Sequence, residues 1–332
     1  MALKARIIGT GSYLPERVLS NSDLEKIVET TDEWIVTRTG MKERRIARSD
    51  EFSSDMGIHA SRAAISDAGL SVDDIDFILV ATTTPDYLFP STACLIQHGL
   101  GAQHAGAVDL LAACTGYLYA LSVAKAFVEA GMYRNVLVVA AEKLSAITNY
   151  KDRSTCVLFG DGAGACVVSS AGKGLAISNI RLGSDGEQAQ FVIMPAGGCR
   201  MPASVDTVQN DQHFIRMAGS ETFKHAVRRM ESACKGCLED AGLAESDISW
   251  LIPHQANLRI IEAIAKRFEH LPPERIYKTI HKYGNTSSST IGIALDELLK
   301  QSQVKNGEHI LLTAFGSGFT WGAALLTAGD GL

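Results

Sequence analysis

The 332-residue sequence predicts an α/β fold built from two similar halves. Apolar runs rich in β-branched residues alternate with helical patterns along the chain, which is typical of layered α/β proteins with buried strands. A helix, turn and strand pattern beginning at Asp67 begins again at Asp240. The composition, 46% hydrophobic and 20% charged, is that of a densely packed protein with one large domain or two.

Seven buried strands are expected in chain order. They lie at 77–84, 105–112, 135–142, 164–170, 248–254, 275–280 and 309–315. Helical segments separate these strands, so the same alternation of strands and helices occurs twice along the chain.

Matching motifs in the two halves are separated by a nearly constant number of residues. The DAGL motif at Asp67 recurs 173 residues later at Asp240, and with an offset of 174 Cys114 falls on Ser288. A duplicated α/β unit explains this pattern, and chance similarity of two amphipathic helix–strand pairs is the alternative. We divide the chain into halves at 1–174 and 175–332. Residues 183–215, rich in Gly, Pro and polar residues, are interpreted as a long loop insertion that acts as a lid or partner surface.

Charge and cysteine content exclude several classes of protein. The net charge of −6 gives no global attraction to nucleic acid or to anionic membranes. The first residues lack a secretory signal, and no run approaches the roughly 20 apolar residues of a membrane span, so a cytoplasmic protein is expected. Seven scattered cysteines indicate free thiols. Cys234 and Cys237 are interpreted as structural helix residues rather than metal ligands.

Cys114 is the candidate nucleophile, because it ends an apolar run and begins a helical one. The small residues Ala112, Ala113 and Gly116 around it leave room for a ligand. A helix N-terminus favours a thiolate, and the backbone N–H of Cys114 would point toward an oxyanion. The alternative is a buried cysteine that serves only packing.

His254 and Asn285 are the expected companions of Cys114. His254 follows the strand at 248–254, and Asn285 precedes the helix that the repeat pairs with that of Cys114. If the halves face each other, the three side chains converge. Taken singly, His254 could be a structural histidine and Asn285 a helix cap.

Two glycine-rich segments have simpler interpretations. The segment at 314–325 is typical of a tight hairpin whose backbone can approach a ligand. The segment at 159–168 lacks the order of glycines and the following helix of a dinucleotide site, so close backbone packing at the domain centre is expected.

The motifs ACTG, PHQANLRI, YGNTSSSTIGIAL, FGDGAGA and AFGSGFTWGAAL, in this order, resemble those of the β-ketoacyl-acyl carrier protein synthase III family of thiolase-like condensing enzymes. The segment at 30–47 resembles the coenzyme A-binding segment of that family, and the similarity covers essentially the whole chain. The resemblance implies a five-layered α-β-α-β-α fold made of duplicated halves and a homodimer. It also implies condensation of an acyl-CoA primer with malonyl-acyl carrier protein, without a metal or redox cofactor.

The resemblance assigns roles to matching residues. Cys114 would take the acyl group, and His254 and Asn285 would bind the thioester oxygen of the malonyl unit. The backbone N–H groups of Cys114 and Ser317 would form the oxyanion hole. The residues matched to coenzyme A binding are Trp34, Arg38, Arg153 and Asn257. Those matched to the acyl pocket are Leu144, Phe159 and Phe89, the last reaching the neighbouring subunit. Those matched to carrier-protein binding are Gln255, Ala256, Asn257, Leu258, Arg259, Lys224 and Lys266.

Two departures from the family pattern stand beside the nucleophile. Ser317 replaces the middle glycine of a common triplet, which leaves its backbone donor intact if serine tolerates the dihedral angles. Thr115 replaces the commoner alanine, and the sequence assigns it no effect.

The expected chemistry is nucleophilic catalysis in two half-reactions, in which Cys114 is acylated and the acyl group then meets an enolate formed by loss of carbon dioxide. Bulky residues matched to the acyl pocket predict a short primer such as acetyl. The alternatives are a Cys-His-Asn thioester or amide hydrolase, which uses the same residue types, and a non-catalytic scaffold that binds a carrier protein.

Overall fold

A nine-stranded mixed sheet with the order β11-β12-β13-β8-β1-β7-β6-β4-β5 organises the molecule. The structure is a computed structural model that describes residues 3–301 and 304–329. The strands of this sheet are β1 (Arg6–Tyr13), β4 (Phe77–Ala81), β5 (Gly106–Leu110), β6 (Asn135–Glu142), β7 (Gly162–Ser169), β8 (Leu175–Ser184), β11 (Ile248–Pro253), β12 (His309–Gly316) and β13 (Thr320–Ala328). The short strands are β2 (Arg17–Ser20) with β3 (Glu43–Ile46), and β9 (Val192–Ile193) with β10 (Arg216–Met217).

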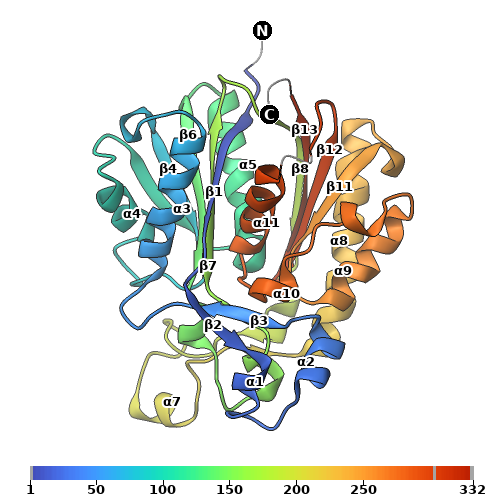
Figure 1. Ribbon diagram of the computed structural model, residues 1–332. Helices are drawn as coiled ribbons and strands as arrows, with labels where there is room; N and C mark the ends of the chain where they lie inside the picture. Colours follow the sequence, from blue (N-terminus) through green and yellow to red (C-terminus); the bar gives the residue numbers. More distant parts are fainter. Residues whose placement is uncertain (1–2, 302–303, 330–332) are drawn as a thin grey trace.

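Helices lie on both faces of this sheet. They are α1 (Asn21–Leu24), α2 (Asp32–Thr39), α3 (Ser53–Asp67), α4 (Thr92–Leu100), α5 (Gly116–Glu129), α6 (Arg153–Cys156), α7 (Val205–Gln209), α8 (Gly219–Ala241), α9 (Leu258–Ala265), α10 (Ile280–Tyr283) and α11 (Ser289–Lys300). The sheet bends into two walls, with α5 and α11 between them, α3 and α4 outside one wall, and α8 and α9 outside the other (Figure 1). The predicted five layers are therefore confirmed.

The two walls are joined at one place, where β1 and β8 pair through Arg6 with Ala176 and Ile7 with Leu175. The layers thus belong to one continuous sheet. The predicted boundary between residues 174 and 175 coincides with the start of β8, which pairs with strands of both walls. The division into halves itself stays a prediction.

The repeat predicted from the sequence has a matching topology. In the first half β4 runs parallel to β6, and β6 runs antiparallel to β7. In the second half β11 runs parallel to β12, and β12 runs antiparallel to β13. The hairpin expected at 314–325 is the β12–β13 connection. The helices α5 and α11, which follow Cys114 and Ser288, contact each other between the walls.

The strand predicted at 275–280 is wrong. Only Ile276 makes a parallel bridge, to Leu251, and α10 begins at Ile280. The reason lies in Gln255, whose buried amide accepts from the N–H groups of Thr279 (2.9 Å) and Ile280 (3.1 Å) and donates to the carbonyl of Tyr277 (3.3 Å). These backbone groups therefore bond to a side chain instead of a neighbouring strand.

The segment at 183–215 is not wholly a loop. Its first residues complete β8, and the rest forms a 3-10 turn (Gly186–Phe191), the short strand β9, and α7. β9 pairs with β10 just beyond the segment. This insertion folds against the site described below.

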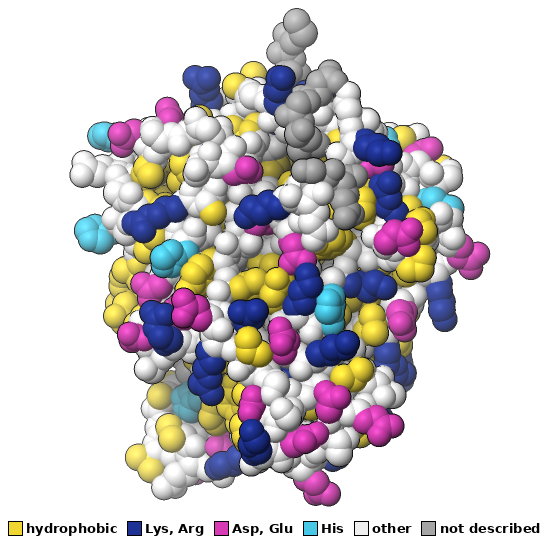
Figure 2. Space-filling view, in the orientation of Figure 1, with side chains coloured by type: hydrophobic (Ala, Val, Ile, Leu, Met, Phe, Trp, Pro, Cys, Tyr) yellow, Lys and Arg dark blue, Asp and Glu magenta, His cyan; other side chains and the backbone are white. Residues whose placement is uncertain are grey.

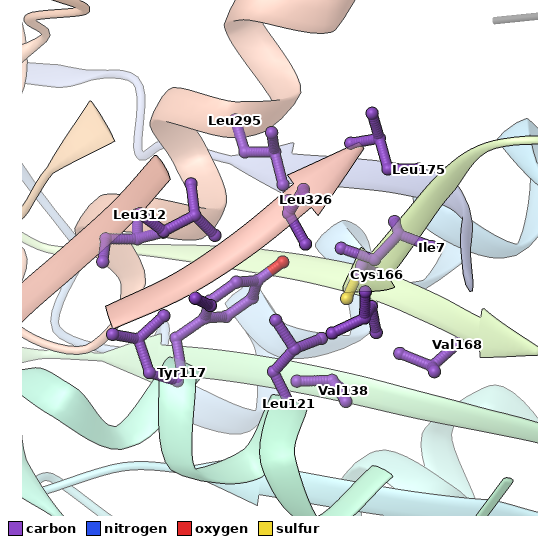
Figure 3. Close-up of a cluster of buried hydrophobic side chains, with 14 of the residues drawn as sticks. Ile7, Tyr117, Leu121, Val138, Cys166, Val168, Leu175, Leu295, Leu312 and Leu326 are labelled. Atoms are coloured by element: carbon purple, nitrogen blue, oxygen red, sulfur yellow. The ribbon is translucent and has the colours of Figure 1, made fainter. Parts of the chain in front are cut away.

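The core between the walls is formed by both halves. Figure 3 shows Tyr117 and Leu121 of α5 among side chains from β1, β6, β7, β8, β12, β13 and α11. The close backbone packing expected at 159–168 is confirmed, since a Cβ on Gly164 would lie 2.7 Å from the backbone of Gly292 in α11. A larger residue at Gly164 would push α11 away from β7.

The surface carries both signs of charge. Basic and acidic side chains are intermixed over the face drawn in Figure 2. Among the described residues no helix is long and apolar enough to cross a membrane. All seven cysteines are free thiols, and Cys234 and Cys237 are buried within α8.

Candidate active site

Cys114 lies in a tight turn between β5 and α5. The 3-10 turn Ala113–Thr115 leads directly into α5, and Ala113 adopts a left-handed conformation with φ of 46°. The hairpin glycine Gly316 packs against this turn, and a Cβ there would lie 2.8 Å from the backbone nitrogen of Cys114. Only glycine allows the hairpin to approach the nucleophile this closely.

His254 follows β11, and hydrogen bonds fix both its backbone and its side chain. Its backbone N–H donates to the carbonyl of Thr313 (2.8 Å), and its Nδ1 lies 2.7 Å from the hydroxyl of Thr290 in the first turn of α11. The side chain is buried. The ring orientation is therefore fixed by contacts that arise within the second half.

Asn285 precedes α11 and is also held by its neighbours. Its Oδ1 accepts from the N–H of Ser287 (2.8 Å), and its own N–H donates to the carbonyl of Leu158 (2.9 Å). Ser287 has a φ of 51°, a left-handed conformation that costs free energy in a residue other than glycine. Its N–H thereby turns back to the Asn285 Oδ1.

The structure brings the three predicted side chains together. Cys114, His254 and Asn285 line one cavity of about 70 Å³, together with Gly316 and Ser317 of the hairpin. The hydroxyl of Ser287 donates to the sulfur of Cys114 at 3.5 Å. The site thus combines a thiol, an imidazole, an amide and the backbone of a hairpin, a set that suits covalent acyl transfer.

Burial of Cys114 acts against the effect that a helix N-terminus has on a thiol. Burial raises the pKa of the Cys114 thiol to about 12. The hydrogen bond from Ser287 lowers the pKa, and the charge of Glu142 raises it further. Loss of hydration therefore favours the thiol form of Cys114 in the free enzyme.

His254 is neutral at physiological pH. Burial lowers the pKa of its imidazole from 6.5 to about 3. An uncharged ring can accept or donate a proton depending on its tautomer.

Sequence reasoning missed Glu142, a buried carboxylate at the end of β6. It accepts hydrogen bonds from the Thr83 N–H (3.0 Å), the Thr84 hydroxyl (2.9 Å) and the Ser288 hydroxyl (2.7 Å). This network ties the end of β4 to the start of α11. An acidic residue that ends an otherwise apolar strand was the available signal.

The two departures from the family pattern both have structural explanations. Ser317 is absent from the residues with positive φ within 3–301 and 304–329, so serine tolerates its dihedral angles, and its hydroxyl donates to the carbonyl of Val192 in the insertion. Thr115 donates to the carbonyl of Ala112 (2.6 Å) and contacts the hydroxyl of Thr320 at 2.7 Å. Each hydroxyl fastens the hairpin to a neighbouring segment.

A second, apolar cavity of about 430 Å³ opens from the sulfur of Cys114. Leu144 and Phe159, matched to the acyl pocket, line it. So do four residues of the insertion, namely Val192, Ile193, Met194 and Ile215. Phe89 does not line it; that side chain is 86% exposed on the loop before α4. The insertion is therefore a wall of this cavity.

Three of the residues matched to coenzyme A binding, Trp34, Arg38 and Asn257, line a cavity of about 680 Å³ that extends to Asn285. The guanidinium of the fourth, Arg153, lies over the Trp34 ring at 4.9 Å, and that of Arg38 at 5.5 Å. The amide of Asn257 donates to the carbonyl of Arg38 (3.2 Å). An aromatic ring flanked by two cations is suited to stacking a planar base.

The residues matched to carrier-protein binding divide into two groups. Gln255 is fully buried on the backbone of 277–280, so its side chain does not reach the surface and can only support this segment. Lys224, Arg259, Ala256 and Asn257 line the mouth of the large cavity, and Leu258 lies beside them at the start of α9. Lys266 is exposed at the end of α9.

Two family profiles match the chain. One, described as 3-Oxoacyl-[acyl-carrier-protein (ACP)] synthase III, matches residues 108–186, which include Cys114. The other, described as 3-Oxoacyl-[acyl-carrier-protein (ACP)] synthase III C terminal, matches residues 238–328, which include His254 and Asn285.

Similar proteins match over nearly the whole chain. Beta-ketoacyl-[acyl-carrier-protein] synthase III of Chlamydia muridarum is 60% identical over 98% of this chain and 99% of its own length. That of Caldanaerobacter subterraneus is 53% identical, covering 98% of both chains. The crystal structure of 3-oxoacyl-[acyl-carrier-protein] synthase III from Aquifex aeolicus is 48% identical and superposes with a TM-score of 0.89, covering 97% of this chain and 99% of that one.

Proposed function

The chain belongs to the β-ketoacyl-[acyl-carrier-protein] synthase III family, and we therefore propose that it condenses a short acyl-CoA, acetyl-CoA first, with malonyl-acyl carrier protein. It is a condensing acyltransferase, as are its relatives. The reaction would begin type II fatty acid synthesis through an acyl thioester on Cys114. The hydrolase alternative is not favoured, because the relatives that match over the full chain are synthases.

The observation that carries this proposal is the convergence of Cys114, His254 and Asn285 on one cavity between two larger ones. The cavity at Trp34 would hold the coenzyme A portion or the carrier protein's pantetheine arm. The apolar cavity at Leu144 would hold the acyl chain. A thioester that spans both would carry its carbonyl past the sulfur of Cys114.

Acyl transfer would proceed by attack of the Cys114 sulfur on the thioester carbon. The oxyanion would lie against the N–H groups of Cys114 and Ser317, which line the same cavity. Such donors act in a water-poor site, where each contributes on the order of 10²–10³ in rate. Coenzyme A then leaves, and the acyl group stays on Cys114.

The condensation would use the same cavity a second time. Malonyl-acyl carrier protein would place its thioester oxygen against His254 and Asn285, and loss of carbon dioxide would leave an enolate at that oxygen. The enolate carbon would attack the acyl-Cys114 carbonyl and release the thiol. Exposed Lys224 and Arg259 at the mouth of the Trp34 cavity, together with exposed Lys266 at the end of α9, would meet the acidic carrier protein.

We further propose a homodimer formed along the edge strand β5. Large apolar side chains are exposed beside this edge: Leu88 (81%), Phe89 (86%) and Leu111 (76%). The loop that carries Phe89 is fixed to β5, because Asp109 accepts from the N–H groups of Thr92 (2.8 Å) and Ala93 (2.7 Å) at the start of α4. Leu111 also lines the apolar cavity, so a second copy docked here would bring its Phe89 to the open end and restrict the primer to short chains.

Mass spectrometry of the enzyme after incubation with acetyl-CoA tests the reaction. We expect acetyl-Cys114 that persists until malonyl-acyl carrier protein is added and then yields a β-ketoacyl product. Rapid release of free acetate without malonyl-acyl carrier protein would instead indicate a hydrolase. An acyl-CoA chain-length series tests the choice of primer, and Phe89→Ala should accept longer chains than wild type. Sedimentation of the wild-type protein tests whether it is a dimer.

A further inference from the structure

We propose that Asp185 and Arg229 are a pair of positioning residues that hold the β12–β13 hairpin where the backbone N–H of Ser317 meets an oxyanion at Cys114. The pair joins the start of the insertion to α8. The inference deepens the proposed function and rests on it, because Ser317 meets an oxyanion only if Cys114 takes an acyl group.

Asp185 lies at the point where the β8–β13 ladder ends. Ser184 is the last residue of β8 and pairs with Thr320 of β13. The N–H of Asp185 then donates to the carbonyl of Phe319 in the hairpin (2.8 Å), and its own carbonyl accepts from the Phe319 N–H (2.6 Å). The ladder holds nothing further along the chain, so the place of the hairpin relative to the insertion depends on how Asp185 is held.

The side chain of Asp185 is held by two different groups. Its Oδ2 accepts from Nη2 of Arg229 in α8 at 2.8 Å. Its Oδ1 accepts from the N–H of Glu187 at the start of the 3-10 turn Gly186–Phe191 (3.3 Å). A hydrogen bond between two charged groups is stronger than one to a neutral donor, so Arg229 is the firmer anchor. One residue thus connects α8, the insertion and the hairpin.

Arg229 is in turn fixed by its surroundings. Its guanidinium carbon lies 4.3 Å from the centroid of the Trp321 ring, which belongs to β13 just after the hairpin. Ala226 and Met230, neighbours of Arg229 on α8, line the cavity of about 70 Å³ that contains Cys114. A cation held by both an aromatic face and a carboxylate has little freedom to move. The pair therefore references the hairpin to the wall of the catalytic cavity.

The hairpin rests on the insertion just beyond Asp185. The Ser317 hydroxyl donates to the carbonyl of Val192, and the buried ring of Phe319 stacks on Phe191 with the ring centroids 6.1 Å apart. A shift of the insertion would therefore carry Ser317 with it. Stabilisation of an oxyanion requires donors at fixed positions, so a small displacement of this N–H slows acyl transfer.

A second Arg–Asp pair joins the same two elements and provides a comparison within the molecule. Arg181 of β8 donates to Asp240 of α8 at 2.9 Å. Its two side chains are 51% and 49% exposed, whereas those of Arg229 and Asp185 are 30% and 22% exposed. The β8–β13 ladder already fixes Arg181, opposite Ala323. We expect this exposed pair to contribute little, because water screens it and the sheet holds the same backbone.

Variants that remove the charges test the pair. Asp185→Asn keeps an acceptor for the Glu187 N–H, and Arg229→Met keeps an apolar side chain against Trp321. Each should slow acylation of Cys114 at saturating acetyl-CoA about tenfold, less than the 10²–10³ expected for loss of a donor, with KM changed less than twofold. The double variant should also lose about tenfold rather than a hundredfold, since either single change breaks the pair. Arg229→Lys should retain most of the rate.

Arg181→Met and Asp240→Asn are the matched controls, and each should change the acylation rate less than twofold. Decarboxylation of malonyl-acyl carrier protein without primer should stay within twofold in every variant, because its thioester oxygen is expected at His254 and Asn285 rather than at the hairpin. Unchanged acylation in Asp185→Asn, similar losses in the two Arg–Asp pairs, or equal losses in both half-reactions would overturn the inference.

Amide hydrogen exchange of the free enzyme reports on the hairpin without an activity assay. In peptides that cover residues 314–321, exchange should become at least about fivefold faster in Arg229→Met and stay at the wild-type rate in Arg181→Met. Unchanged exchange in Arg229→Met would contradict the inference. Failure of the proposed function would look different, because wild type itself would not become acylated while exchange of the hairpin could still be measured.

Discussion

The starts of α5 and α11 occupy equivalent places in the two halves, but Cys114 and its counterpart Ser288 have different surroundings. Cys114 lines two cavities at the start of α5. Its counterpart Ser288 is 1% exposed at the start of α11, where its hydroxyl donates to Glu142 (2.7 Å). The repeat therefore places a helix start at the same point in each half. The residues around that point decide whether the side chain there is reactive, as at Cys114, or structural, as at Ser288.

The residues at the two helix starts also contact and support each other. The residues just before α11, Asn285 and Ser287, contact or face the sulfur of Cys114. Glu142, from the first half, holds the start of α11 in return. The nucleophile belongs to one half and its supporting groups to the other, so the site exists only when the halves are packed together.

Removal of the thiol from position 114, and its transfer to position 288, gives the largest expected effect. Cys114→Ala should lower condensation by at least about 10⁴-fold, because loss of a nucleophile removes the covalent route. The double variant Cys114→Ala/Ser288→Cys should not recover activity, since its thiol is enclosed at Glu142. Acylation of the double variant by acetyl-CoA, followed by mass spectrometry, would refute the proposed difference between the two helix starts.

Asn285→Asp tests what the segment before α11 contributes to the condensation half-reaction. The carboxylate can still accept from the Ser287 N–H but cannot donate, so decarboxylation of malonyl-acyl carrier protein should fall by about 10²–10³-fold. Acylation of Cys114 should fall much less. Stopped-flow measurement of each half-reaction checks this, and equal losses would mean that the substitution disturbs the whole turn.

Ser288→Ala should affect stability rather than chemistry. It removes one hydrogen bond to a buried carboxylate, which costs about 2 kcal/mol in the free energy of unfolding. Ser178→Ala, which removes an exposed hydroxyl contact with Thr327, is the matched control and should cost under about 0.5 kcal/mol. Urea unfolding at fixed protein concentration measures both, and equal values would show that Glu142 does not depend on Ser288.

Acid should lower the stability of the folded protein through His254. The folded protein holds this ring neutral with a pKa near 3, whereas the unfolded chain protonates it below about pH 6.5. The unfolded state thus binds the extra proton, and stability falls with falling pH over that window, by about 1.5 kcal/mol between pH 6.5 and 5. His254→Gln should remove this part of the slope in urea titrations; an unchanged slope would contradict a buried neutral ring.

Much of the fold and of the site was predictable from the sequence, because it depends on local pattern. The alternation of strands and helices and the doubled DAGL motif predicted a layered fold with two similar halves, and the family resemblance implied its five layers. The positions of Cys114, His254 and Asn285 in the repeat predicted which side chains meet. The strand at 275–280 was not predictable in its true form. Its backbone groups bond to the side chain of Gln255, and nothing in the local pattern of either segment reveals that contact.

By itself, the sequence determined most of the element types, the repeat and the identity of the reactive groups, since these depend on residue type and spacing. The tertiary structure alone decided the burial of Cys114 and His254, the environment of Glu142 and the use of the insertion as a cavity wall. The physical reason is that pKa values and hydrogen-bond partners depend on burial and on contacts between residues far apart in the chain. Those contacts form only when the two halves pack together.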